Sequence, residues 1–250
     1  MAEKVVVERS GPVTTLRLNR DNAANAIDVE MALAIAEAIG AFAADDAARV
    51  LVVTGSGDRA FCAGGDLNEL LEITDHSQAD RAGPLGFARL DPGKPTIAAV
   101  NGHCYGGGLE LALWCDWRLA AEDAQFGALN RQWGVPLIDG GTQRLPRIVG
   151  YGNAMWLICT GCRIDAQRAL QIGLVQELVP AGQALPRALE FARALAQLPQ
   201  PALLADRRGV VASAEQALRA GLDFEARAGR AVMRDPDVIQ RLTEYRERHV

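Results

Sequence analysis

Three successive glycines followed closely by a glutamate are the residues of this sequence best suited to chemistry. Residues 106–108 are the glycines, and Glu110 lies in the first turn of the apolar helical segment that they open. Because they lack Cβ atoms, these glycines leave the N–H groups of a helix start open to a ligand, and the helix dipole adds positive potential there. Such a site favours a developing negative charge, and a carboxylate one turn away can move protons. The stretch therefore predicts an oxyanion hole with an acid/base group beside it.

The same residues also fit plain structural roles. A run of glycines serves a tight turn or close helix packing, and a glutamate in a first helical turn complements the helix dipole. A phosphate-binding loop fits poorly, because no Gly-Lys-Ser/Thr sequence follows the glycines. The catalytic interpretation rests on Glu110, because an apolar helix would bury this carboxylate at a cost in free energy.

A second glycine turn occurs earlier in the chain, again at the end of a strand. Residues 49–54 and 96–100 are short apolar runs rich in β-branched side chains, which predict buried strands. Residues 61–67, with the sequence FCAGGDL, follow the first strand, as residues 106–108 follow the second. Ligands of open α/β sheets bind at the carboxyl ends of strands. Each turn can therefore supply one N–H donor to a shared oxygen, as an oxyanion hole requires.

The rest of the pattern alternates strands and helices up to residue 179 and is helical beyond it. Asp28 is a candidate N-cap for the helix that follows it. Residues 75–92 are polar and interrupted by glycine and proline, which indicates a mobile connection. The chain also contains a hairpin predicted over residues 5–18 and late helices predicted over residues 185–198, 201–214, 215–233 and 235–248.

Composition narrows the class of protein. The chain has 250 residues, 49% of them hydrophobic, and a net charge of -5 without a dense Lys/Arg run, which argues against nucleic acid as a partner. Its apolar runs are too short to span a bilayer, and its first residues lack the pattern of a signal peptide, so we expect a cytoplasmic protein with no membrane partner. The five cysteines lie in apolar segments and predict reduced core thiols. Cys159 and Cys162 form a C-x-x-C without a nearby histidine, so no metal site is predicted.

Four motifs in order make the sequence resemble the crotonase superfamily, the enoyl-CoA hydratases and isomerases. They are residues 61–67 (FCAGGDL), 94–102 (KPTIAAVNG), 106–111 (GGGLEL) and 140–145 (GGTQRL). The resemblance covers nearly the whole chain. It implies an α/β fold, a crotonase-like spiral of ββα repeats in residues 1–198 that binds acyl-CoA. Residues 199–250, too short for a core of their own, would then be a helical trimerisation region, giving a homotrimer or a dimer of trimers.

The resemblance also implies a site. A thioester enolate would be stabilised by the backbone N–H groups of Gly65 and Gly107. Coenzyme A would enter as part of the acyl-CoA substrate, with no metal and no separate cofactor. The residues that fall where the family holds the nucleotide and pantetheine are Ala24, Ala26, Ala63, Asp66 and Leu67.

The sequence departs from the family hydratases at one position. Glu110 matches the first of the two glutamates that hold the catalytic water in the family hydratases, but Asn130 stands at the position of the second glutamate. An amide orients water but cannot exchange its proton at neutral pH. Asp139 lies on a loop that neighbours the active site in the family and offers a second carboxylate, or else an N-cap for the next helix. We expect structural roles for three further residues. His103, on the turn before the glycines, would support the pocket, and Trp114 and Trp133 would pack against other side chains.

We therefore expect an enoyl-CoA hydratase-like lyase with Glu110 as the acid/base. Gly65 and Gly107 would be the oxyanion donors, and Asn130 and Asp139 would position the water. One alternative is a double-bond isomerase that uses Glu110 alone. The other is a non-catalytic acyl-CoA binder that lost activity with the second glutamate.

Overall fold

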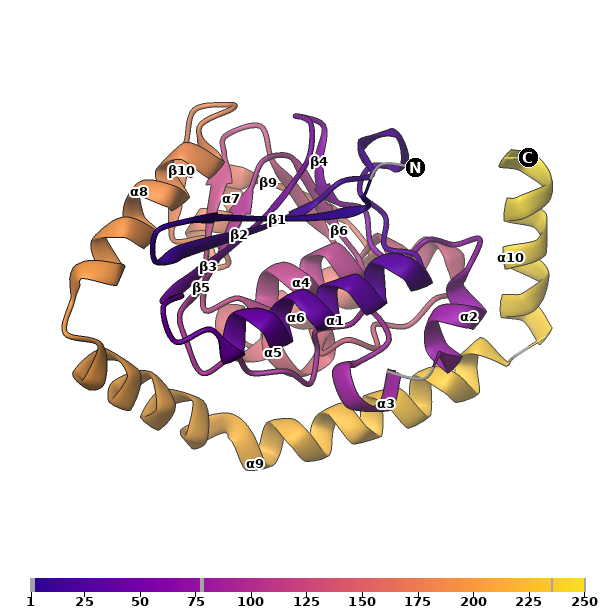
Figure 1. Cartoon of the computed structure of the whole chain (residues 1–250). Coiled ribbons are helices and arrows are strands. Elements are labelled where there is room, and N and C mark those ends of the chain that lie inside the picture. The colour runs from indigo at the N-terminus through magenta and orange to yellow at the C-terminus, as the bar shows by residue number, and fades with distance from the viewer. Residues whose placement is uncertain (1–2, 77–78, 235, 250) are drawn as a thin grey trace.

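The computed structural model describes residues 3–76, 79–234 and 236–249, and its strands form two sheets (Figure 1). The six-stranded sheet has the order β1-β2-β3-β5-β7-β10, and the four-stranded sheet has the order β4-β6-β8-β9. The strands are β1 (Val5–Ser10), β2 (Val13–Leu18), β3 (Val50–Gly55), β4 (Ala60–Cys62), β5 (Thr96–Val100), β6 (His103–Tyr105), β7 (Trp117–Ala121), β8 (Gln125–Gly127), β9 (Arg163–Asp165) and β10 (Glu177–Val179). The helices are α1 (Val29–Ala44), α2 (Leu70–Asp75), α3 (Ala79–Ala82), α4 (Gly107–Trp114), α5 (Gly141–Val149), α6 (Tyr151–Thr160), α7 (Ala166–Gln171), α8 (Ala184–Gln197), α9 (Gln200–Met233) and α10 (Pro236–His249), with short 3-10 turns at Asp21–Ala23 and Leu129–Trp133.

Repeated strand–strand–helix units build the spiral. β3, β5 and β7 lie parallel in the large sheet, and the strand after each of them, β4, β6 or β8, joins the small sheet. A helix follows each pair, namely α2, α4 and α5. The predicted α/β spiral of ββα repeats is therefore confirmed. It brings the ends of β4 and β6 together, so that the two glycine turns after them become neighbours.

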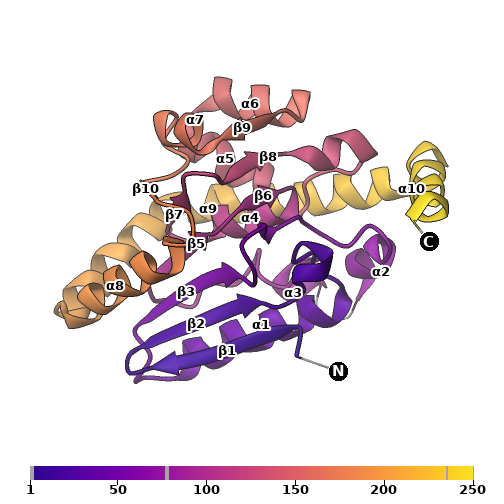
Figure 2. The ribbon, with the colours of Figure 1, turned by 90° about the horizontal axis from the view of Figure 1, so that it is seen from above.

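Alternation along the strands sends side chains to both faces of the large sheet, as a parallel sheet covered on both sides requires. Leu51 and Val53 of β3 join the main core, together with α1 and α4. Val50 and Val52 face α8 instead, where Ala184, Ala188, Ala192 and Ala196 allow close packing. Figure 2 shows α8 beside the sheet and α1 against β1 and β2. The helix α1 begins as predicted, because the side chain of Asp28 accepts a hydrogen bond from the N–H of Met31 at 2.9 Å.

One prediction about connections is wrong, and a second connection is more buried than its polar sequence suggests. The helices expected over residues 201–214 and 215–233 form one helix, α9, of 34 residues, and no glycine or proline interrupts the sequence between Val210 and Ala220. The connection over residues 75–92 is packed rather than exposed over much of its described length. Leu85 and Phe87 are at most 4% exposed, and the Phe87 ring meets the Trp114 ring edge-on at 6.2 Å.

The C-terminal helices pack against the core of their own chain. In Figure 1, α9 runs along one side of the body from α8 to α10. Arg207 on α9 pairs with Asp91 at 2.9 Å and Asp116 at 3.0 Å, and Arg89 pairs with Asp223 at 2.8 Å. The helical region after residue 198 is thus present, while its part in a homotrimer or a dimer of trimers stays a prediction. Among the described helices, none combines the length and apolarity needed to cross a membrane.

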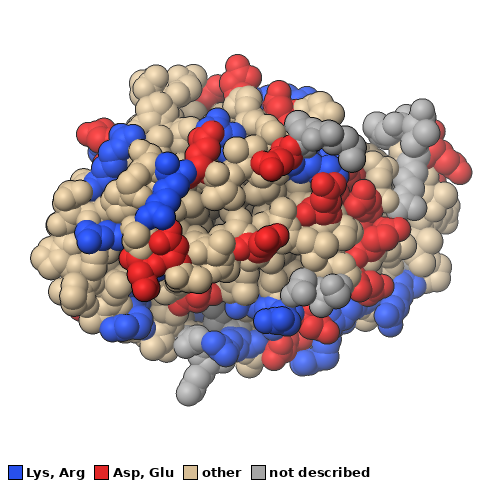
Figure 3. Space-filling view, in the orientation of Figure 1, with Lys and Arg blue, Asp and Glu red and all other residues tan. Residues whose placement is uncertain are grey.

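The surface carries charges of both signs, and most of the cysteines are at least partly buried. On the face shown in Figure 3, acidic and basic side chains of the described residues are interspersed among neutral ones. All five cysteines are free. Cys62, Cys104 and Cys115 are buried, as predicted, but Cys159 is exposed on α6, so the prediction of core thiols is wrong for that residue.

Candidate active site

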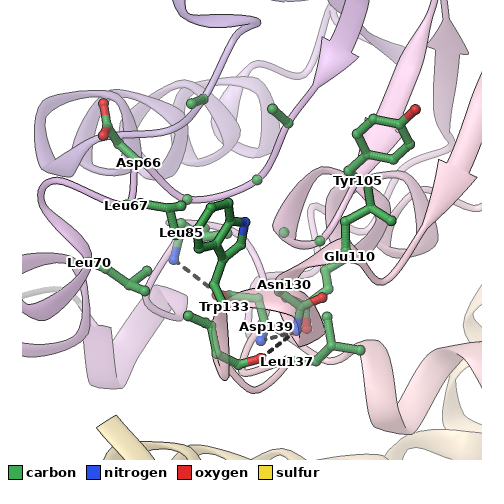
Figure 4. A pocket seen from close by; sticks show the side chains of 18 of the residues that line it. Asp66, Leu67, Leu70, Leu85, Tyr105, Glu110, Asn130, Trp133, Leu137 and Asp139 are labelled. Atoms are coloured by element: carbon green, nitrogen blue, oxygen red, sulfur yellow. Dashed lines mark hydrogen bonds between the residues drawn. The ribbon is translucent and has the colours of Figure 1, made fainter. Parts of the chain in front are cut away.

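A pocket of about 430 Å³ opens where β4 and β6 end and α4 begins (Figure 4). All the residues predicted for catalysis and for coenzyme A line it: Gly65, Gly107, Glu110, Asn130, Asp139, Ala24, Ala26, Ala63, Asp66 and Leu67. These residues come from points far apart in the sequence, and the spiral brings them together. Their individual roles stay predictions.

The two glycine turns form one wall of this pocket. A Cβ atom on Gly64, whose φ is +109°, would lie 3.0 Å from the nitrogen of Gly107, and one on Gly107 would lie 3.3 Å from the nitrogen of Gly65. The two N–H groups are therefore close neighbours, and side chains at these positions would crowd them. Two neighbouring N–H groups already have acceptors within the protein. The N–H of Asp66 donates to the carbonyl of Ile27, and the N–H of Gly106 donates to the carbonyl of Gly127. In the described part of the chain, the N–H groups of Gly65 and Gly107 have no internal acceptor.

A buried thiol supports the first turn from behind. The N–H of Gly64 donates to Cys62 Sγ at 3.4 Å. Burial raises the pKa of the Cys62 thiol to about 12, and the hydrogen bond from Gly64 offsets this only in part. Cys62 therefore stays protonated near neutral pH and supports the turn without acting as a nucleophile.

Glu110 has its carboxylate fixed by backbone donors. Its side chain is 2% exposed, and Oε1 accepts hydrogen bonds from the N–H groups of Asp139 at 2.9 Å and Gly141 at 2.8 Å. Two donors on one oxygen orient the carboxylate and compensate for its burial. The turn before α5 thus holds in place the carboxylate that α4 carries.

Asp139 contributes a second buried carboxylate to the same pocket. It is fully buried, and its Oδ1 accepts a hydrogen bond from the N–H of Leu85 at 3.1 Å. The N-cap residue of α5 is Gly140, so Asp139 lies one residue before the cap position. Arg144 Nη1 donates to the carbonyl of Asp139 at 3.1 Å and fixes this peptide from the other side.

Asn130 presents an oxygen to the pocket. Its Nδ2 donates to the carbonyl of Val135 at 2.7 Å, which orients the amide. Its Oδ1 is buried and has no hydrogen-bond partner among the described residues. A Cβ atom on Gly106 would lie 3.7 Å from this oxygen, so Oδ1 lies beside the second glycine turn. The position can accept a hydrogen bond from a ligand or a water.

The part of the pocket predicted to hold coenzyme A is built on backbone. Ala24 and Asn25 have φ values of +51° and +55°, and the Asn25 side chain fixes this bend by donating to the Ala60 carbonyl at 2.8 Å. The Ala63 N–H donates to the carbonyl of Ala24 at 3.0 Å. The Asp66 carboxylate pairs with Arg20 at 3.0 Å. The small alanine side chains leave an open strip along this wall.

Several lining residues were not found from the sequence. Trp133, predicted to serve packing, lines the pocket, and its ring meets the ring of Tyr245 on α10 at 4.9 Å. Tyr105 and Leu85 also line the pocket. The Gly-Pro-Leu-Gly sequence at residues 83–86 signals a turn at Leu85, but no local signal places Tyr245 there. His103 lies outside the lining and stacks on Tyr105 at 5.2 Å, in line with a structural role.

Comparison with known proteins identifies the class. The family model for enoyl-CoA hydratase/isomerase matches residues 8–250. A probable enoyl-CoA hydratase of Rhizobium meliloti (strain 1021) is 37% identical over 257 residues, covering 98% of this chain and 99% of that protein. A crotonyl-CoA hydratase of Syntrophomonas wolfei is 40% identical over 194 residues, covering 76% of this chain and 74% of that protein. The crystal structure of carnitinyl-CoA hydratase from Mycobacterium avium matches with a TM-score of 0.92 and 30% identity, covering 99% of this chain and 97% of that chain.

The spiral of ββα repeats is thus shared with a class of enzymes. The chain belongs to the enoyl-CoA hydratase/isomerase family.

Proposed function

We propose that the protein adds water to the α,β double bond of an enoyl-CoA thioester, and also catalyses the reverse dehydration. One observation carries the proposal: the fixed carboxylate of Glu110 shares a pocket with the open N–H groups of Gly65 and Gly107. The hydratase names of the relatives support the same reaction.

The two N–H groups would receive the charge that develops on the thioester oxygen. Hydration at C3 moves the double-bond electrons toward the thioester, so the carbonyl oxygen becomes an enolate oxygen. Donors at about 2.7–3.1 Å from that oxygen stabilise it, and one such donor contributes roughly a 100- to 1000-fold rate gain. Gly65 and Gly107 would each supply one donor.

Glu110 would carry the proton. Its carboxylate takes a proton from water while the water oxygen bonds to C3, and the resulting acid delivers that proton to C2. The net change is one hydroxyl on C3 and one hydrogen on C2, and Glu110 returns to its starting state. A single carboxylate is therefore sufficient for the proton balance.

Asn130 and Asp139 would position the water in this scheme. Asn130 Oδ1 accepts a hydrogen bond and is held in place by the bond from Nδ2 to Val135. Asp139 would supply the second carboxylate in place of the glutamate that Asn130 replaces. It lies in the turn before α5, whose N–H groups donate to Glu110. Coenzyme A would lie along Ala24, Ala26 and Ala63 as part of the substrate, and the chemistry requires no separate cofactor or metal.

The test is incubation with crotonyl-CoA in water enriched in heavy oxygen and deuterium, followed by mass spectrometry of the thioester. Hydration predicts heavy oxygen at C3 and deuterium at C2. Deuterium without oxygen would favour a double-bond isomerase using Glu110 alone, the alternative that Asn130 in place of a carboxylate suggests. Binding of the ester without either label would indicate a non-catalytic acyl-CoA binder.

A further inference from the structure

The side chain of Leu85 stands in front of both glycines of the proposed oxyanion hole. A Cβ atom on Gly107 would overlap Leu85 Cδ1, and one on Gly65 would lie 3.4 Å from Leu85 Cδ2. Leu85 is 4% exposed and lines the pocket (Figure 4). Its two methyl groups therefore occupy the space directly beside the two N–H donors.

Leu85 is held where it is by its own backbone. The N–H of Gly86 donates to the carbonyl of Gly83 at 3.0 Å and closes a tight turn around Leu85. The N–H of Leu85 donates to Asp139 Oδ1 at 3.1 Å. Further along, Arg144 Nη2 donates to the carbonyl of Ala88 at 2.6 Å. With both sides of the turn anchored, the leucine cannot withdraw without breaking buried hydrogen bonds.

The position of Leu85 relative to a bound thioester follows from the proposed function, on which this inference rests. A carbonyl between Gly65 and Gly107 has sulfur on one side and C2 on the other. Sulfur leads toward the predicted pantetheine strip, and C2 faces the proton carrier Glu110. The N–H of Leu85 donates to Asp139 Oδ1, and the N–H of Asp139 donates to Glu110 Oε1. We therefore place Leu85 on the same side of the carbonyl as Glu110, which is the C2 side.

We propose that Leu85 is a specificity residue that excludes acyl groups branched at the α-carbon. A methyl group on C2 would need the volume that the Leu85 methyls fill, and overpacking a close-packed site is unfavourable. The substrate class is then a thioester with an unbranched C2. Beyond C3 the pocket is lined by Leu70, Val135, Leu137 and Ile138, which suit an apolar chain.

The test uses saturated esters, so that binding is measured without turnover. Calorimetry on the whole chain compares butyryl-CoA with 2-methylbutyryl-CoA, which has the same four-carbon chain and adds one methyl group at C2. We expect the wild type to bind butyryl-CoA about 10-fold more tightly or better. This ratio is in the range by which an apolar pocket discriminates between ligands that differ by one methyl group. In Leu85→Ala the ratio should fall to about 3-fold or less, mainly through tighter binding of 2-methylbutyryl-CoA, as the pocket gains room.

Matched variants separate this effect from a general change in the pocket. Leu137→Ala removes the same volume beside Gly141 and Glu110, so it should change both affinities alike and leave the ratio as in the wild type. If circular dichroism shows that Leu85→Ala does not fold, Leu85→Val takes its place, with a ratio between the two.

Two results would overturn the inference. A wild type that binds both esters equally, or a Leu85→Ala ratio equal to the wild-type ratio, would show that Leu85 does not select the acyl group. Either result would leave hydration unaffected if heavy oxygen enters crotonyl-CoA. If neither ester binds, the acyl-CoA site itself is wrong, and the proposed function fails together with this inference.

Discussion

Two walls of the pocket differ in which groups they present: one presents backbone N–H donors, and the other presents polar side chains. The donor wall, formed by Gly64, Gly65, Gly106 and Gly107, presents backbone N–H groups and has no side chains. The carboxylate wall, formed by Glu110, Asn130 and Asp139, presents side chains that backbone groups hold. The donor wall can be changed only by adding atoms. The carboxylate wall can be changed by isosteric exchange, so the two contributions can be tested separately.

The largest effect is expected on the carboxylate wall, from Glu110→Gln. The glutamine oxygen can still accept from the N–H groups of Asp139 and Gly141, so the melting temperature should change little. An amide cannot exchange the proton, and hydration of crotonyl-CoA should fall about 1000-fold or more. Glu122→Gln, at an exposed position, is the matched control and should retain activity. Full turnover by Glu110→Gln would remove this residue from the mechanism.

The donor wall should respond next, to Gly107→Ala. The new methyl group would overlap Leu85 Cδ1 and crowd the nitrogen of Gly65 at 3.3 Å. The donors and the carbonyl can then no longer meet at their best distance, and kcat/KM should fall about 100-fold, as for the loss of one oxyanion donor. Gly152→Ala is the control, because nothing lies within 4 Å of its Cβ position. A Gly107→Ala enzyme as active as this control would contradict the oxyanion assignment.

Asp139→Asn should have a smaller effect than Glu110→Gln. The asparagine oxygen can still accept from the Leu85 N–H, while the carboxylate charge is lost. In the proposed reaction Glu110 alone would carry the proton, so we expect kcat to fall roughly 10- to 100-fold, toward the lower end of general acid–base contributions. Stopped-flow or spectrophotometric hydration assays measure this, with exposed Asp123→Asn as the control. A loss equal to that of Glu110→Gln would instead make the two carboxylates equal partners.

The smallest effect concerns the thiols behind the donor wall. Burial raises the pKa of Cys62 to about 12 and also raises the pKa of Cys104 and of Cys115. At pH 8 these thiols should therefore resist alkylation, while exposed Cys159 is modified and activity is retained. Peptide mass spectrometry reads the sites, and unfolding in denaturant should expose all five cysteines. Rapid labelling of Cys62 in the folded enzyme would show that the donor wall opens.

The two walls also differ in how far the sequence predicts them. The two glycine turns and Glu110 were found because a strand, a glycine turn and a helix follow one another locally, and the resemblance then singled out Gly65 and Gly107 within those turns. Asp139 was found as a candidate through the resemblance, but whether it capped α5 or faced the pocket depended on the Leu85 N–H, which folding brings from another segment. A local pattern cannot report such a partner.

Packing of distant segments explains the remaining errors. Leu85 lies in a stretch whose glycines and proline suggest mobility, yet buried contacts from several elements fix it. Trp133 packs as predicted, against the ring of Tyr245, but no local signal shows that this contact also lines the pocket. The break expected within α9 was also wrong, because residues 210–220 contain no glycine or proline that would interrupt the helix.

The pocket draws on both ends of the chain, from Ala23 and Ala24 near the start to Tyr245 on α10. A ribosome must therefore release residues 23 to 245 before this pocket can close. Until then, Leu70, Val135 and Trp133 have no Met233, Val238 or Leu242 to cover them. During synthesis the chain therefore exposes apolar surface at its future pocket, the kind of surface that makes incomplete chains prone to aggregation.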